Sequence, residues 1–143
     1  MARRAGAALI LVSLLPGASP VGRLDVEIGK LRSEKGMLRL CLTADPDNFP
    51  GCLDDKHAVT RSVAASERSV RFDGLSGGRY ALSVIHDENG NAKLDTFAGI
   101  PREGFGFSRN PAIRFGPPRF SSAQFELATG TRNEQDVRIR YMF

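Results

Sequence analysis

The residues best suited to chemistry in this sequence lie between positions 87 and 95. Asp87, Asn89 and Asn91 place an oxygen-bearing side chain at every second position, and Asp95 follows four residues later. A tight loop with carboxylate, amide and backbone oxygens at this spacing is the front half of a calcium-binding pattern. The sequence therefore predicts a Ca²⁺ site formed by these four side chains and the backbone carbonyl of Lys93.

This loop departs from the helix–loop–helix calcium motif at two positions. The glutamate of position 12 is replaced by Ala98, and the glycine of position 6 is replaced by Ala92. Helices are not expected on either side, so the loop is not an EF-hand. Two loop carboxylates predict weak binding, with a dissociation constant of about 10⁻⁴ to 10⁻³ M, and Glu103 is a candidate third carboxylate. The alternative is a turn held only by hydrogen bonds, because Asp and Asn bond to their own backbone and tolerate left-handed geometry.

Catalytic chemistry finds little support in the sequence. The two histidines are His57 and His86, and a Ser-His-Asp arrangement needs an oriented base. The alternation of the residues before His86 points it inward, which favours a packed histidine over a catalytic or metal-binding one. Hard oxygen ligands without histidine suit structural Ca²⁺ better than a catalytic metal. We therefore expect no catalytic residues, and interpret the chain as a non-catalytic binding or accessory module.

A β-sandwich is expected to position the loop. Short segments of alternating apolar and polar residues, separated by Gly, Pro, Asn and Asp, are typical of strands. They lie at residues 24–28, 38–42, 69–73, 79–85, 122–127 and 137–141, with a weaker one at 59–65. The stretch 99–118 contains four prolines and is expected to be irregular. About seven short strands predict an all-β, antiparallel sandwich.

The first nineteen residues differ from the rest of the chain. Arg3 and Arg4 precede an apolar run at 5–15, and Pro16, Gly17 and small residues follow. This order is typical of a secretory signal peptide. We predict a signal peptide at 1–19, a single domain at 20–143, and a periplasmic or secreted protein. The alternative is a retained membrane anchor, although the run is shorter than the roughly 20 residues that a span requires; we expect no transmembrane segment in the mature form.

The charge of the mature domain argues against nucleic-acid binding. The full chain carries twenty basic and sixteen acidic residues, a net charge of +4. Loss of residues 1–19 removes two arginines and no acids, which leaves eighteen against sixteen, or +2. A nearly balanced domain lacks the basic surface that nucleic acids require. We expect the partner to be a small molecule, a glycan or a protein.

The two cysteines, Cys41 and Cys52, predict one disulfide bond. An even number of cysteines in an exported protein most simply forms a pair. Strand alternation puts Cys41 on the face away from the main core, where it can reach the turn-rich loop 44–55. Closing so short a loop contributes somewhat less than about 3 kcal/mol in the chain-entropy model.

The segment 102–120 interleaves aromatic and basic residues. Its members are Phe105, Phe107, Phe115 and Phe120 with Arg102, Arg109, Arg114 and Arg119. Such spacing can stack rings on sugars or bases and hold phosphates, so a carbohydrate- or phosphate-binding surface is one alternative. We prefer the interpretation that the phenylalanines pack beneath a loop while the arginines face solvent.

Several stretches resemble DUF2141, a family of bacterial secreted proteins known only as a domain of unknown function. They are GGRYALSVIHDENGN at 77–91, KLD at 93–95 and GIPREGFGFS at 99–108, with FGPP at 115–118 and the cysteine pair also similar. The resemblance implies an immunoglobulin- or transthyretin-like sandwich and supplies no activity. Family members often have glycine where this chain has Ala92. A transthyretin-like hydrolase remains an alternative, but its Tyr-Arg-Gly-Ser tail has no counterpart in the final residues, 140–143.

Overall fold

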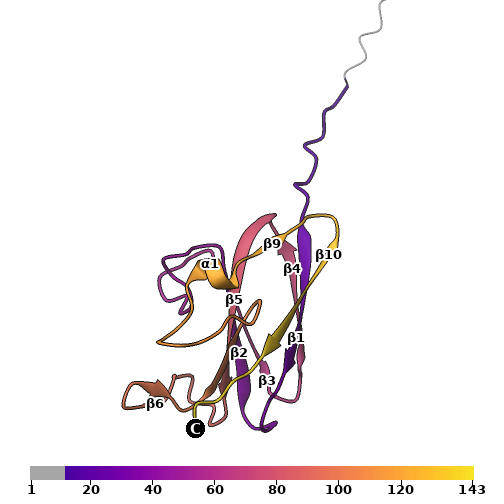
Figure 1. Cartoon of the computed structure of the whole chain (residues 1–143). Helices are drawn as coiled ribbons and strands as arrows, with labels where there is room; N and C mark the ends of the chain where they lie inside the picture. Colours follow the sequence, from indigo (N-terminus) through magenta and orange to yellow (C-terminus); the bar gives the residue numbers. More distant parts are fainter. Residues whose placement is uncertain (1–11) are drawn as a thin grey trace, which may run out of the picture.

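The computed structural model describes residues 12–143, which form two β-sheets packed against each other (Figure 1). The first sheet has the order β10-β1-β4, built from Arg132–Arg138, Gly22–Gly29 and Ser69–Leu75. The second has the order β3-β2-β5-β8, built from Val59–Ala64, Met37–Thr43, Gly78–Asp87 and Gly104–Phe107. The expected all-β sandwich is confirmed; most neighbouring strands are antiparallel, and β1 with β10 is a parallel pair.

Smaller elements lie beside the second sheet. Strand β9, Phe125–Leu127, pairs with the start of β5, and the short helix α1, Phe120–Ala123, precedes it. Strands β6, Thr96–Phe97, and β7, Ile100–Pro101, form a separate hairpin just before β8. Figure 1 shows this hairpin and the C-terminus at one end of the sandwich, and the N-terminal segment leaving from the other end.

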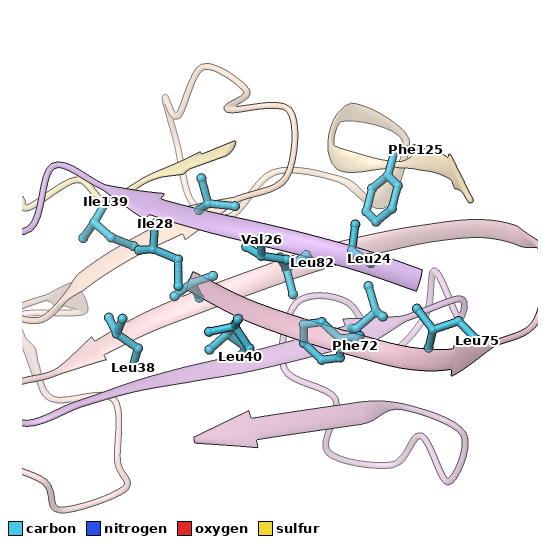
Figure 2. Close-up of a cluster of buried hydrophobic side chains, with 14 of the residues drawn as sticks. Leu24, Val26, Ile28, Leu38, Leu40, Phe72, Leu75, Leu82, Phe125 and Ile139 are labelled. Atoms are coloured by element: carbon cyan, nitrogen blue, oxygen red, sulfur yellow. The ribbon is translucent and has the colours of Figure 1, made fainter. Parts of the chain in front are cut away.

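One apolar core fills the space between the sheets (Figure 2). Alternate residues of β1 and β2 face it, and β4, β5, β9 and the segment after β10 add further side chains, which include Leu24, Val26, Leu38, Leu40, Phe72, Leu82, Phe125 and Ile139. Because each inward side chain is separated from the next by an outward one, these strands read as alternating patterns. Cys41 lies outside this core, as the alternation predicts, and is joined to Cys52.

Three sequence-based boundaries differ from the structure. The stretch expected to be irregular contains β8, whose sequence Gly-Phe-Gly-Phe lacks the usual strand pattern. A Cβ atom at Gly104 would lie 2.4 Å from the Tyr141 ring, and one at Gly106 would lie 2.7 Å from Val137. The glycines therefore let the C-terminal segment pack onto β8. The prediction that 122–127 is one strand is wrong because its first residues belong to α1, and the last strand lies at Arg132–Arg138 rather than 137–141.

The signal-peptide prediction falls largely on residues 1–11, which lie outside the described residues. Residues 12–20 are exposed and have no regular secondary structure. Among residues 12–143, none of the helices has the length and apolar character needed to cross a membrane.

Candidate functional site

The predicted calcium loop begins where β5 ends, at Asp87. Strand β5 lies between β2 and β8. Asp87 lies opposite Met37 of β2, and it is one residue beyond the last pair of β5 with β8, which is His86 with Gly104. The hairpin of β6 and β7 follows the loop and returns the chain to β8. The loop, the hairpin and the start of β8 therefore lie together at one end of the second sheet.

Asp87 is fully buried and accepts hydrogen bonds from three donors. The Arg39 Nε donates to it at 2.7 Å, the backbone N–H of Ala92 at 2.9 Å and that of Asn91 at 3.2 Å. Burial by itself would raise the pKa of Asp87, but the Arg39 guanidinium and these backbone donors outweigh it and hold the pKa below its usual value. Asp87 is therefore ionised and fixed in place.

Asp95 closes the loop from its other end. The side-chain amide of Asn89 donates to it at 2.7 Å, and that of Asn91 donates at 3.1 Å. These two hydrogen bonds are the main reason that the pKa of Asp95 is lowered. The predicted side chains at 87, 89, 91 and 95 are thus brought together, and Lys93 joins them through its N–H, which donates to the Asn91 oxygen at 2.9 Å.

Ala92 makes the turn that glycine makes in calcium loops. Its φ angle is +59°, in the left-handed region that L-residues adopt only at a cost. The alanine that replaces the glycine of position 6 therefore adopts the turn under backbone strain.

Glu103 lies beside the loop, and its pKa is raised, whereas those of Asp87 and Asp95 are lowered. Its side chain is 5% exposed, and Oε2 accepts the backbone N–H of Asp95 at 3.3 Å. Burial raises the pKa of Glu103 to about 7; the Asp95 N–H opposes the rise, and the negative charges of Asp87 and Asp95 add to it. The carboxylates at 87, 95 and 103 therefore influence one another directly.

The arrangement of these groups is not that of a closed metal site. Among residues 12–143, no group of three or more His, Cys, Asp or Glu side chains is already arranged to hold a metal ion. The amide groups of Asn89 and Asn91 turn their N–H₂ ends toward Asp95. An ion would require these amides to turn their oxygens inward, a rotation that exchanges two atoms of similar size.

The sequence did not reveal Arg39 as part of this site. It lies 48 residues before Asp87 in the chain and reaches it because β2 pairs with β5. The available signal was the alternation within β2, which places Arg39 on the face opposite Leu38 and Leu40. That alternation gives no partner, because the partner depends on strand register.

A second polar cluster flanks the loop and involves His86. Its Nε2 donates to the Lys35 carbonyl at 2.8 Å, and its Nδ1 lies 2.7 Å from the Tyr141 hydroxyl. His86 is fully buried, so the prediction of a packed histidine is confirmed. With both ring nitrogens engaged, it is poorly placed to act as the base that a hydrolase requires.

Arg32 and Glu88 form the outer part of this cluster. Their side chains are joined by an ion pair of 2.5 Å, Ser33 donates to Glu88 at 2.9 Å, and the Arg32 guanidinium lies 4.3 Å from the centre of the Tyr141 ring. Burial would raise the pKa of Glu88, but Arg32 and Ser33 lower it overall. Glu88 is therefore paired within the fold.

An open cleft of about 490 Å³ lies between the two clusters. Its walls are polar and come from the loop, the hairpin and the segment after β1, namely Arg32, Glu88, Asn89, Asp95, Thr96, Arg102 and Glu103. Arg102 is exposed and directly follows β7, and its backbone N–H donates to the Asp95 carbonyl at 2.8 Å. Asp95 and Glu103 thus line the cleft, whereas Asp87 is fully buried and is not part of its wall.

The phenylalanines of 102–120 behave in two ways. Phe107 and Phe120 are buried against Phe49, with ring centres 5.7 and 6.0 Å from it, and Phe105 packs beside them. The prediction that the rings pack beneath a loop holds for these residues. It is wrong for Phe115, which is fully exposed in the segment between β8 and α1.

Fold and site together define a small disulfide-bonded β-sandwich domain with a polar loop closing one end. The model of a family described as uncharacterised proteins conserved in bacteria, DUF2141, matches residues 26–135, and the chain belongs to this family. The match spans both cysteines, the 87–95 loop and Glu103. No curated protein and no solved structure matches the chain.

Proposed function

We propose that the protein is an exported, non-catalytic binding or accessory module whose 87–95 loop takes a Ca²⁺ ion. The observation that carries this proposal is the gathering of Asp87, Asn89, Asn91 and Asp95 around one turn at the end of β5. Carboxylate and amide oxygens are the ligands that Ca²⁺ prefers, and its coordination tolerates irregular geometry. The ion orders the loop and the hairpin that follows it.

Export is supported by composition and by the disulfide. The basic and apolar start of the sequence is typical of a signal peptide. A disulfide between Cys41 and Cys52 persists best in an oxidising compartment such as the periplasm or the cell exterior. A non-catalytic role is supported by His86, whose two ring nitrogens are both engaged.

The test is the response of the melting temperature to added Ca²⁺ after treatment with a chelator. An ion that binds only the folded state adds about 2.7 kcal/mol at a hundredfold excess over its dissociation constant. We expect millimolar Ca²⁺ to raise the melting temperature and Mg²⁺ to raise it less, because Mg²⁺ demands a stricter octahedron. An unchanged melting curve at millimolar Ca²⁺ would mean that the loop is only a hydrogen-bonded turn.

A second candidate function is favoured by the exposure of Phe115. Its fully exposed ring could stack on a sugar ring, and the neighbouring Arg114 could bind an anionic group of a glycan. Phe115→Ala should leave the melting temperature unchanged and remove binding on a panel of neutral and anionic glycans. Phe107→Ala is the matched control, since it should lower stability by about 3 kcal/mol because the ring is buried.

A further inference from the structure

We propose that Glu103 supplies the third carboxylate of the calcium site, so that the ion joins the 87–95 loop to β8. This inference rests on the proposed function and adds a ligand from outside the loop. It replaces the glutamate that the loop lacks at position 12, where the sequence has Ala98.

Strand register brings Glu103 to the first carboxylate of the loop. In the antiparallel pairing of β5 with β8, His86 lies opposite Gly104. The next residue along β5 is Asp87, and the residue before Gly104 is Glu103, so these two acids are neighbours at the strand ends. Both are buried, with exposed fractions of 0% for Asp87 and 5% for Glu103.

One oxygen of Glu103 has no partner. Oε2 accepts the N–H of Asp95, whereas Oε1 is buried without any hydrogen bond. The side chains that act on it most strongly are Asp87 and Asp95, which are negative. A buried carboxylate in such surroundings is costly unless a proton or a cation joins it.

The charges around Glu103 do not balance within the described part of the chain. Asp87, Asp95 and Glu103 carry three carboxylates, and Arg39 is the cation paired with one of them, Asp87. Within residues 12–143, two exposed cationic side chains lie nearby without an ion pair to these acids, Lys93 and Arg102. A divalent cation supplies the two positive charges that this group lacks.

The available ligands favour calcium over other divalent metals. Three carboxylates, two side-chain amides and the Lys93 carbonyl offer six oxygens, the lower limit of the six to eight that Ca²⁺ takes. Zinc prefers histidine or cysteine, and His86 is engaged elsewhere. The β6–β7 hairpin lies between the 87–95 loop and Glu103. An ion bound by both the loop and Glu103 therefore links the two ends of the segment 87–103.

The competing explanation is a proton. A protonated Glu103 would donate a hydrogen bond to a neighbouring carboxylate and remove the charge imbalance without any metal. The two explanations differ in what the Glu103→Gln variant does to calcium affinity, because glutamine mimics the protonated acid and is a poor calcium ligand.

The experiment measures Ca²⁺ binding by calorimetry at pH 8, after chelator treatment, for the wild type, Glu103→Gln and Glu88→Gln. Glu88→Gln is the matched control, since it removes the same charge from the same cleft but at a residue paired with Arg32. We expect one Ca²⁺ per wild-type chain, an affinity at least about tenfold weaker in Glu103→Gln, and a change within about threefold in Glu88→Gln.

The outcomes separate this inference from the proposed function. No Ca²⁺ binding by the wild type overturns the proposed function, and the inference with it. Calcium binding that Glu103→Gln leaves unchanged overturns only the assignment of Glu103, and favours the proton. A crystal soaked in CaCl₂ is a second measurement that needs no variant, with an ion expected about 2.3 to 2.6 Å from a Glu103 oxygen. An ion bound to the loop alone would contradict the assignment.

Discussion

Two acidic residues, Asp25 and Glu103, face opposite electrostatic surroundings at two places in the same sandwich. The Asp25 side chain on β1 is 12% exposed and lies among three guanidinium groups, with Arg132 at 2.7 Å, Arg71 at 2.8 Å and Arg23 at 3.5 Å. The hydrogen bond from Arg71 is the main cause of its lowered pKa. Glu103 is similarly buried, but its neighbours are other carboxylates and its pKa is raised.

The difference shows where the fold supplies its own counter-charge and where it does not. Asp25 is neutralised by arginines of β1, β4 and β10, so the strand pairing that builds the first sheet also balances its charge. At the end of the second sheet, strand pairing brings Glu103 to Asp87 and concentrates negative charge instead. A fold with this imbalance is completed by something bound from solution, either a proton or an ion.

The largest expected effect comes from Asp87→Ala. This change leaves the Arg39 guanidinium without its carboxylate and the Ala92 N–H without its acceptor, while the Asn91 N–H keeps only the Asn89 oxygen. We expect the free energy of unfolding in urea to fall by about 3 kcal/mol, and the Ca²⁺ response to be lost.

Glu88→Ala is the control for this variant, because it breaks a more exposed ion pair with Arg32 next to the same loop. It should cost about 1 kcal/mol or less and keep the Ca²⁺ response. If the two variants lose equal amounts of unfolding free energy, Asp87 has no special role in organising the loop compared with Glu88, which lies beside it.

The next largest effect is a pH dependence that separates the two regions. The folded pKa of Glu103 is raised from 4.5 to about 7, so the ion-free folded state binds more protons than the unfolded state between these values. The stabilising effect of the protonated acid is fully present below pH 4.5 and is lost as pH rises to about 7. We expect a loss of roughly 3 kcal/mol across this window, measured by urea denaturation in a chelator. Saturating Ca²⁺ should reverse the loss.

Two variants isolate the pH dependence. Glu103→Gln should remove the slope between pH 4.5 and 7. Asp25→Asn should leave that slope intact and instead flatten the stability curve on the acid side, because the lowered pKa of Asp25 gives stability that is present above about pH 3.8 and lost as pH falls. If the slope between pH 4.5 and 7 remains in Glu103→Gln, another group titrates in that range. The contrast drawn between Glu103 and Asp25 would then be wrong.

The smallest expected effect concerns Ala92→Gly. Glycine adopts the left-handed conformation without steric cost, although it loses more backbone entropy on folding. The variant should gain about 0.5 to 1 kcal/mol in thermal unfolding and bind Ca²⁺ more tightly. Ala98→Gly is the control, because Ala98 also has a positive φ, +49°, but lies outside the ion loop. It should raise stability without changing calcium affinity.

The sequence predicted the loop better than it predicted what surrounds it. The spacing of Asp87, Asn89, Asn91 and Asp95 is local, so the pattern alone places these side chains around one turn. Glu103 was only a candidate, because its burial depends on β8. That strand was missed because its glycines serve the close approach of the C-terminal segment, a contact that no local pattern records.

The same limit applies to the fold. Strands with one buried face were found from their alternation, as in β1 and β4. Strand β10 was misplaced because its first five residues are polar and it is held by main-chain pairing with β1 rather than by burial. Alternation predicts burial well, but pairing at a polar edge leaves no such signal.

The parallel pair of β1 and β10 has a consequence for how the chain reaches its folded state. Arg23 of β1 lies opposite Arg132 of β10, so β1 cannot complete its pairing on this edge until β10 has been synthesised. Contacts this distant in sequence slow folding, and until they form one edge of β1 is open to other chains. A nascent chain that stops before residue 132 therefore has an unpaired edge on β1. This edge is open to aggregation until β10 has been synthesised and pairs with it.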